Sequence, residues 1–298
     1  MLNLSLYGTE HRGYGGYWIT KLIGCKPIIF ELRSSLNLLT GRHFSKESIY
    51  DTDFPPPRAR QPVNQLLALL PKEDYERILP HLEPIALSLG DVLYEAGAPQ
   101  RYVYFPTTCT VSMLYVMENG GTAEMAITGN EGVVGIALYM GGDTMPNRSV
   151  IQSAGCALRL KANILQKEFK LGSHFQQILL RYTQALITQM TQTAVCNRLH
   201  TLDQQLCRWL LMSCDRLATD KLVMTQELMA HMLGVRRAGI TGAARLLQAE
   251  GLITYRRGHV TILDRPGLEA RVCECYQVVN KEFERLFDKR LVAIDMTT

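Results

Sequence analysis

Residues 225–245 read TQELMAHMLGVRRAGITGAAR, and this stretch decides how the rest of the sequence is interpreted. Thr225 is a favourable N-cap for a helix, and Glu227 places a carboxylate in the first turn, where it favours the helix dipole. Ala230 is small at the point where a second helix must cross the first. Gly234 follows four residues later, where the chain must turn and a positive φ is often required. We therefore predict a helix that ends in a tight turn before a second helix begins.

The second helix is predicted from its inward face. Ile240, Ala244 and Leu247 recur at helical spacing and would pack against the first helix. Two helices that meet at a steep angle through a short turn form a helix-turn-helix. The N-terminal end of the second helix would then enter a DNA major groove, where arginine can bond guanine in bidentate fashion.

A hairpin-like segment, residues 252–262, follows the second helix and favours the winged form of this motif. Its tip carries basic side chains that suit contacts with phosphates. We predict DNA contacts from nine residues of the two helices and the wing: Thr225, Gln226, Arg236, Arg237, Thr241, Arg245, Arg256, Arg257 and His259.

The distribution of charge supports this interpretation better than the total does. The formal net charge of the 298-residue chain is only +4. Between residues 220 and 265, seven lysine and arginine side chains face four acidic ones, an excess of three. Most of the basic excess therefore coincides with the predicted winged helix. The alternative is a solvated basic face on a structural helical domain.

The residue pattern differs in the segments on either side of this motif. Residues 61–174 alternate apolar and polar side chains in short runs between glycines, which predicts about eight strands in an antiparallel roll. Residues 1–60 have no sustained period and end in a proline-rich connector, so we expect a poorly structured leader. A last amphipathic helix is predicted over 266–298. The predicted fold class is α+β: a β-roll of the jelly-roll type, joined by a long helix to a winged helix-turn-helix domain over 200–265.

The long helix is predicted over residues 175–199, where apolar side chains recur every three or four positions. The repeating positions begin with Phe175, Ile178, Leu179, Tyr182, Leu186 and Met190. Because a helix of this length cannot be buried entirely against a small roll, we predict that these residues form a dimer interface in a coiled-coil-like pairing. The alternative is an ordinary core helix.

Together these features resemble the Crp/Fnr family of bacterial transcription regulators over roughly residues 64–264. The most specific matches are TQEL at 225–228, LGVRR at 233–237 and LLQAEGLI at 246–253. In the roll, GDVLYEAG at 90–97 is similar to the opening glycine-rich strand pair of the family. The resemblance implies a homodimer that reads the two half-sites of a pseudo-palindromic operator in double-stranded DNA, with RNA polymerase as a further partner.

Two positions of the predicted recognition helix depart from the family pattern. Arg237 matches the arginine of an Arg-Glu pair that many members carry. Ala238 stands in place of the glutamate, and Gly242 stands in place of a second arginine four residues later. We therefore expect the preferred half-site to differ from the usual sequence of the family.

The resemblance also implies an effector site in the roll. In cyclic-nucleotide-binding members, a Gly-Glu pair binds the ribose and an Arg-Ser or Arg-Thr pair binds the phosphate. Glu131 stands at the first place, although asparagine replaces the glycine, and Arg148 and Ser149 stand at the second, beyond an insertion at 141–147. The expected ligand is a cyclic nucleotide or another phosphate-bearing effector. The alternative is an ion pair of Arg148 with a local acid such as Glu131 or Asp143.

The eight cysteines are scattered, and no Cys-x-x-Cys pair occurs. Cys273 and Cys275 are two residues apart in a predicted helix, where their side chains would project roughly 200° from each other. We therefore expect no metal site and reduced thiols, with redox sensing as the alternative.

Several protein classes are excluded by missing motifs. The sequence has no HExxH, P-loop or dinucleotide fingerprint, so we expect no enzymatic activity. No run approaches the ~18 apolar residues of a membrane span, and we expect a cytoplasmic protein with no membrane partner. The predicted function is a sequence-specific DNA-binding regulator with a sensory roll. The alternative is a cyclic-nucleotide-type module that acts through protein contacts and carries a degenerate DNA-binding domain.

Overall fold

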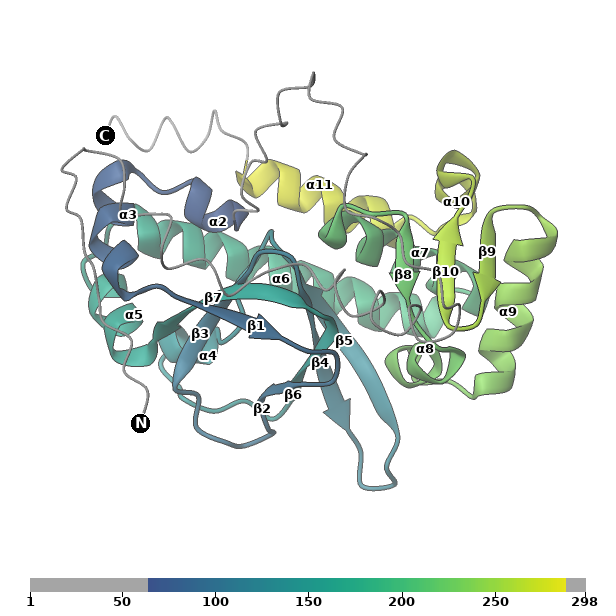
Figure 1. Cartoon of the computed structure of the whole chain (residues 1–298), viewed down its shortest axis with the longest axis horizontal. Coiled ribbons are helices and arrows are strands. Elements are labelled where there is room, and N and C mark those ends of the chain that lie inside the picture. The colour runs from purple at the N-terminus through teal and green to yellow at the C-terminus, as the bar shows by residue number, and fades with distance from the viewer. Residues whose placement is uncertain (1–63, 288–298) are drawn as a thin grey trace, which may run out of the picture. The chain divides into compact units, whose positions relative to one another are not determined.

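The computed structural model describes residues 64–287, and its N-terminal half is a β-roll (Figure 1). The predicted leader over 1–60 lies outside the described residues, as do residues 288–298 of the predicted tail. Two antiparallel sheets form the roll, with strand orders β1-β7-β3 and β2-β6-β4-β5. Their strands are β1 (Glu83–Leu87), β2 (Val92–Tyr94), β3 (Tyr102–Pro106), β4 (Thr110–Val116), β5 (Thr122–Thr128), β6 (Arg148–Ser153) and β7 (Gly155–Lys161).

Alternation of side chains along the strands places the apolar ones inside the roll. In β3, Val103 and Phe105 are fully buried, whereas Tyr102 and Tyr104 are only half-buried. This period of two is what a strand with one face on a core requires. The predicted antiparallel roll is confirmed.

Short helices flank the strands of the roll. They are α2 (Gln65–Ala68), α3 (Lys72–Ile78), the 3-10 helix η1 (Leu79–His81), α4 (Ala137–Met140) and α5 (Ala162–Phe169). The buried Asn64 side chain caps α2 by accepting hydrogen bonds from two backbone amides of that helix. Its amide nitrogen also donates to the carbonyls of Pro106, at 2.9 Å, and Gly132, at 2.8 Å. One polar side chain therefore anchors the first described helix to the roll.

Helix α6 (His174–Leu199) follows the roll and packs against it. Its start is fixed by Asp74 of α3, whose carboxylate accepts a hydrogen bond of 3.0 Å from the backbone N–H of Phe175. None of the helices within residues 64–287 combines the length and the apolar character that a membrane crossing requires.

The residues of α6 that we predicted to form a dimer interface instead line the interior of this chain. Five of them are at most 2% exposed and the sixth is partly buried, in one core with the roll and the C-terminal helix: Phe175, Ile178, Leu179, Tyr182, Leu186 and Met190. The periodicity identified a buried face of α6 correctly, but the roll and α11 of the same chain cover this face, and not a second copy. The alternative interpretation, an ordinary core helix, describes this face.

The C-terminal part of the described chain, which contains the predicted helix-turn-helix, is helical with a small antiparallel sheet. Its elements are α7 (Leu202–Leu217), β8 (Lys221–Val223), α8 (Gln226–Leu233), α9 (Arg237–Ala249), β9 (Ile253–Arg256) and β10 (His259–Ile262), with strand order β8-β10-β9. A common core of α7, α8, α9 and the sheet holds these elements together.

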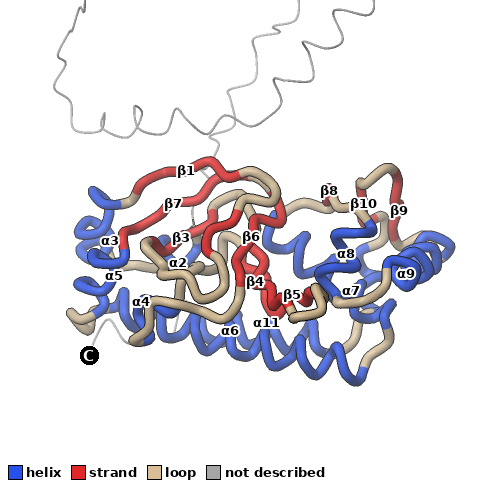
Figure 2. The backbone as a smooth tube through the Cα atoms, turned by 90° about the horizontal axis from the view of Figure 1, so that it is seen from below, coloured by secondary structure: helices blue, strands red, loops and turns tan. Residues whose placement is uncertain are grey.

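The chain after the wing forms two helices, α10 (Arg265–Arg271) and α11 (Cys275–Phe287), where we expected one. Figure 2 shows α11 beside α6, and the two helices run antiparallel. Phe283 lies edge-on to Tyr182 with ring centroids 6.4 Å apart, and Gln184 donates a hydrogen bond of 3.2 Å to Glu282. Helix α11 therefore covers part of α6 that the roll does not contact.

Gly132 permits a close approach between the roll and α6. The hydroxyl of Tyr182 forms a hydrogen bond of 2.9 Å with the hydroxyl of Thr128, and the ring of Tyr182 lies directly against Gly132. A Cβ atom at position 132 would lie 2.4 Å from the ring and 2.5 Å from the hydroxyl oxygen. Because both residues are inside the packed core, neither can move aside without a cavity or a clash elsewhere.

We predict that Gly132→Ala destabilises the protein by about 1–3 kcal/mol, the usual cost of overpacking a core. Urea denaturation of the full chain measures this change. Gly142→Ala is the matched control, because a Cβ at that position has no neighbour closer than 3.9 Å. Equal stability of the two variants would contradict the prediction.

Candidate nucleic-acid interface

The helix-turn-helix has the local structure that its sequence predicts. The Thr225 side chain accepts a hydrogen bond of 3.1 Å from the backbone N–H of Leu228 and so caps α8. Gly234 ends α8 in the left-handed conformation, with φ of 66°. Ile240, Ala244 and Leu247 of α9 are the buried face: none is more than 1% exposed. These predictions of cap, turn and buried face are confirmed.

Hydrogen bonds tie the two helices to each other and to the wing. The Thr241 hydroxyl of α9 lies 2.7 Å from Gln226 Oε1 at the start of α8. The backbone N–H of Gln226 in turn donates to the Tyr255 hydroxyl of β9 at 3.1 Å, and Gln248 Oε1 accepts from the Tyr255 backbone at 2.8 Å. Gln226 and Thr241, both predicted DNA contacts, are therefore already hydrogen-bonded to each other, and they hold the motif in shape.

Five arginines of α9 and the wing are exposed and have no carboxylate partner within the described residues. Three belong to the start and outer face of α9 and two to the hairpin of the wing: Arg236, Arg237, Arg245, Arg256 and Arg257. Thr225 and His259 are exposed as well. All of the charged side chains in the predicted set are thus free to contact a ligand.

The other arginines of the same region are neutralised. Arg265 lies 2.5 Å from Asp215 and 2.8 Å from Glu269. Arg271 lies 3.0 Å from Asp203 and 2.7 Å from Glu250. Arg265, one of the seven basic residues counted in the sequence, is therefore neutralised by acids and does not contribute to the basic face. Glu250, one of the four acidic residues, is paired with Arg271 and does not neutralise that face. Five of the six remaining basic residues are the arginines of α9 and the wing, and the sixth, Lys221, is exposed on β8.

The turn of the wing has positive φ angles, which are uncommon, and it includes one of the two arginines of the hairpin and lies beside the other. Arg257 has φ of 50° and Gly258 has φ of 81°, so the two-residue turn lies in the left-handed region. Such turns match the twist of a tight hairpin. Arg256 and His259 are paired across the turn. The hairpin therefore places three basic or titratable side chains at its tip.

The predicted effector residues do not share a contact. Glu131 Oε1 lies 2.8 Å from Arg216 Nε of α7, and both side chains are largely buried. Arg148 Nε instead lies 3.1 Å from Glu95, at the surface. Ser149 is fully buried in β6. Arg148 thus forms a local ion pair, as the alternative interpretation held, but with neither of the two acids that we expected.

A second buried carboxylate joins the roll to α7. Glu124 of β5 accepts hydrogen bonds from Trp209 Nε1 at 2.8 Å, from Gln152 Nε2 at 3.0 Å and from the hydroxyl of Ser112. Burial raises the pKa of Glu124 to about 7, although these hydrogen bonds and the nearby Arg208 favour the charged form. Glu124 therefore keeps its proton through a range of pH in which an exposed glutamate has lost it.

This shift predicts a pH-dependent stability that Glu124→Gln removes. In the unfolded chain the Glu124 carboxyl ionises near pH 4.5, whereas in the folded chain it ionises near pH 7. The folded state binds more protons between these values, so the free energy of unfolding falls as the pH rises from about 4.5 to about 7 and is level above that. The loss is on the order of 3 kcal/mol. Urea denaturation at pH 5 and pH 7.5 measures it, with the exposed Glu118→Gln as control; the same pH slope in Glu124→Gln would exclude this role.

Comparison with known proteins identifies the domain that carries these arginines. A family model described as the Crp-like helix-turn-helix domain matches residues 204–271. Residues 204–271 are a Crp-like helix-turn-helix domain. The match includes α7, the helix-turn-helix, the wing and α10. A comparison of the sequence with curated proteins found no match.

Solved structures extend the likeness to the roll and show that the chain has the Crp/Fnr fold. FixK2 from Bradyrhizobium japonicum is 16% identical, with a TM-score of 0.57 over 64% of this chain and 98% of that one. The c-di-GMP-responsive global regulator CLP from Xanthomonas campestris is 16% identical, with a TM-score of 0.52 over 64% and 99%. A CRP-family transcriptional regulator from Thermus thermophilus is 15% identical, with a TM-score of 0.54 over 63% and 95%.

The structure also assembles a group of residues that the sequence did not indicate. Cys196, His200, Cys273 and Cys275 converge at the end of α6. Our expectation that the last two cysteines share one helix is wrong, because the chain leaves the helical conformation after Arg271 and Cys273 precedes α11. The apolar period continues across this break, which is why the sequence pattern did not reveal it.

Proposed function

We propose that this protein is a sequence-specific DNA-binding transcriptional regulator that acts as a homodimer on a pseudo-palindromic operator. The observation that carries the proposal is the set of five unpaired arginines on α9 and the wing, beside arginines that are neutralised by acids. A basic face that served only solubility would not require unpaired arginines to be grouped on α9 and the wing while the neighbouring arginines are paired with acids. The Crp-like domain and the Crp/Fnr fold support the same function. The proposal involves no catalytic step, and it places the protein in the cytoplasm with RNA polymerase as a partner.

The face of α9 is suited to reading bases with few side chains. Arg237 is the first residue of α9, so its guanidinium can reach guanine in the major groove. Ala238 is exposed, and Gly242 has no neighbour within 4 Å of the position of a Cβ. This part of α9 therefore leaves room for bases, and we expect Arg237 and Arg245 to supply most of the base preference.

We predict that Arg237→Ala lowers the affinity for the preferred operator by about 1–3 kcal/mol, roughly 5- to 150-fold, and relaxes the preference at one base pair. Arg257→Ala, on the wing, should weaken binding to all sequences alike and reduce the salt dependence by about one counterion. Selection of operators from a random duplex library, followed by fluorescence anisotropy at two salt concentrations, measures both effects.

The control for these variants is Arg101→Ala, which removes the same charge from an exposed position of the roll. It should leave the affinity for DNA almost unchanged. Failure of the wild-type protein to select any sequence, or binding without salt dependence, would overturn the proposed function.

A dimer interface is supported by the outer face of α6, on the side away from the residues predicted earlier. Leu180 and Ile187 are 49% and 50% exposed and seven residues apart, and Val195 and Leu199 continue the exposed apolar residues toward the end of the helix. A spacing of seven is the repeat of a coiled-coil seam. We propose that this face pairs with the same face of a second copy.

We predict that Ile187→Glu shifts the protein from dimer to monomer, because it places two carboxylates opposite each other in an apolar seam. Analytical ultracentrifugation measures the shift. Leu89→Glu is the control, since Leu89 is 55% exposed in the turn before β2 and not on α6. A dimer that survives Ile187→Glu unchanged would place the interface elsewhere.

Effector sensing by the roll would act on the contact with α7. Glu131 is one of the residues that the resemblance assigns to a ligand, and its present partner, Arg216, belongs to the DNA-binding half. A phosphate-bearing ligand that engaged this region would compete for that ion pair and so loosen α7 from the roll. The similarity to a c-di-GMP-responsive regulator supports a ligand of this chemical class.

A further inference from the structure

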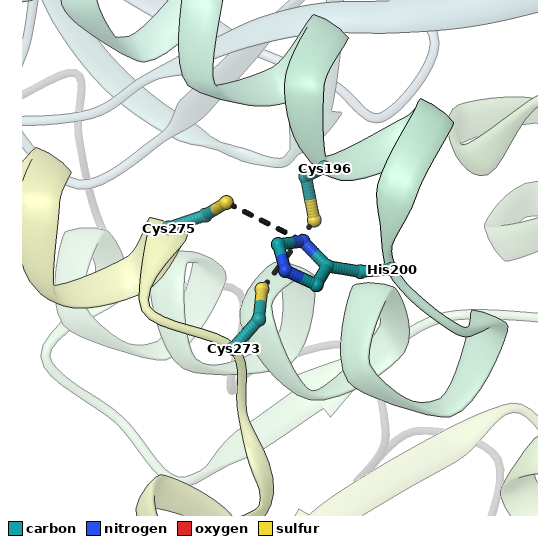
Figure 3. A group of neighbouring side chains, drawn as sticks. All are labelled: Cys196, His200, Cys273 and Cys275. Atoms are coloured by element: carbon teal, nitrogen blue, oxygen red, sulfur yellow. Dashed lines mark hydrogen bonds between the residues drawn. The ribbon is translucent and has the colours of Figure 1, made fainter.

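Four side chains from two distant segments meet at the junction of α6 and α7 (Figure 3). Cys196 lies in the last turn of α6, and His200 is the residue that caps its C-terminus. Cys273 lies in the connection between α10 and α11, and Cys275 is the first residue of α11. The three sulfurs and a ring nitrogen of His200 all lie within 4.8 Å of one another.

The distances within this group are those of a tetrahedral metal site. Zinc bonds of about 2.3 Å to sulfur and about 2.0 Å to nitrogen separate two sulfurs by about 3.8 Å and a sulfur from a nitrogen by about 3.5 Å. Cys196 Sγ and Cys273 Sγ are 3.5 Å apart, and Cys275 Sγ lies 3.6 Å from His200 Nδ1. The longest separation of 4.8 Å would have to shorten by about 1 Å, which side-chain rotation can supply.

The kinds of donor and their burial select the metal. Three thiolates and one imidazole are a soft, four-ligand set, which is a common composition of structural zinc sites. The three cysteines are at most 3% exposed, and the side chain of His200 is 15% exposed. Four protein ligands in a closed pocket leave no position for water or substrate, so the site suits structural zinc.

The surroundings hold the ligands in the orientation that a metal needs. Nδ1 of His200 faces the sulfurs, while Nε2 lies 3.3 Å from the Glu274 carboxylate. A carboxylate on the outer nitrogen is the usual partner of a metal-bound histidine, because it fixes the tautomer. Gln205 of α7 donates hydrogen bonds to the carbonyls of His200, at 2.9 Å, and Cys196, at 3.4 Å, which fixes the end of α6.

A buried cation balances the charge that the metal complex would carry. Zinc with three thiolates and a neutral imidazole has a net charge of −1. Arg208 of α7 is only 3% exposed and lies close enough to Cys196 and Cys275 to interact with both electrostatically. Its Nε has no hydrogen-bond partner within the described residues. The guanidinium therefore provides the positive charge that an anionic complex in a buried place requires.

We propose that Cys196, His200, Cys273 and Cys275 bind one Zn²⁺ per chain. The bound ion would join the end of α6 to the start of α11, next to the point where the chain enters the DNA-binding domain. This proposal is independent of the operator and of the effector, because it rests only on the four ligands and their surroundings.

The test is the metal content and metal-dependent stability of the full chain. Protein purified under reducing conditions should contain about one zinc per chain by elemental mass spectrometry. After removal of zinc by a chelator, added Co²⁺ should produce the visible absorption of a tetrahedral cobalt–thiolate complex. Added Zn²⁺ should raise the midpoint of thermal unfolding, since a ligand that binds only the folded state stabilises it.

Variants separate the site from general effects of cysteine replacement. Cys275→Ala and His200→Ala should lose the zinc and the response to added Zn²⁺, whereas His200→Cys should retain both with four thiolates. Cys214→Ala is the matched control, because Cys214 is equally buried on α7 and lies outside the group. Circular dichroism checks that each variant is folded, and the cobalt spectrum of the wild type tests the site even where a variant does not fold.

Two outcomes would overturn the proposal. The first is wild-type protein that contains no zinc and gives no cobalt–thiolate absorption after full reduction. The second is a Cys196–Cys273 disulfide, found by mass spectrometry of protein kept under reducing conditions, since that bond would consume two of the four ligands.

Discussion

The arrangement of the described chain depends on two buried carboxylates of the roll that hold helix α7. Arg216 Nε lies 2.8 Å from Glu131 and 3.0 Å from the carbonyl of Ile127, and Trp209 donates to Glu124. Removing one partner of such a contact leaves the other polar group buried without compensation, which is costly. The position of the Crp-like domain relative to the roll thus depends on polar contacts that only one geometry satisfies, whereas apolar packing alone would tolerate several positions.

The helix-turn-helix could be predicted in detail because its signals are local. A capping hydroxyl at Thr225, a glycine with positive φ at position 234 and a buried face that begins at Ile240 act within one or two turns of helix. The alternating residues of the roll are equally local, and they predicted an antiparallel roll of about eight strands, of which the described residues form seven. In both cases the residue that carries the signal and the backbone that responds to it are close in sequence.

Contacts between distant segments could not be predicted in the same way. The apolar period of α6 shows that one face is buried, but it does not show whether the cover is a second chain or the roll and α11. Glu131 was matched to a ligand by its position in a motif, whereas Arg216, its partner in the fold, lies in a helix that the motif does not include. Cys196 and Cys273 are likewise too far apart in sequence for their spacing to indicate a common site.

Because α11 returns along α6, the two connections of the Crp-like domain to the rest of the described chain lie side by side and form a single neck. The chain enters this domain just after His200 and leaves it at Cys273, and the side chains at these two points lie within 4.8 Å of each other. Residues 201–272 therefore form a closed loop. Its two peptide connections to the rest of the described chain lie next to each other. Such a loop could rotate about its neck without stretching either connection only if the contacts of α7 with Glu131 and Glu124 were broken. A rotation of this kind would change the position of α9 while α6 and α11 kept their mutual packing.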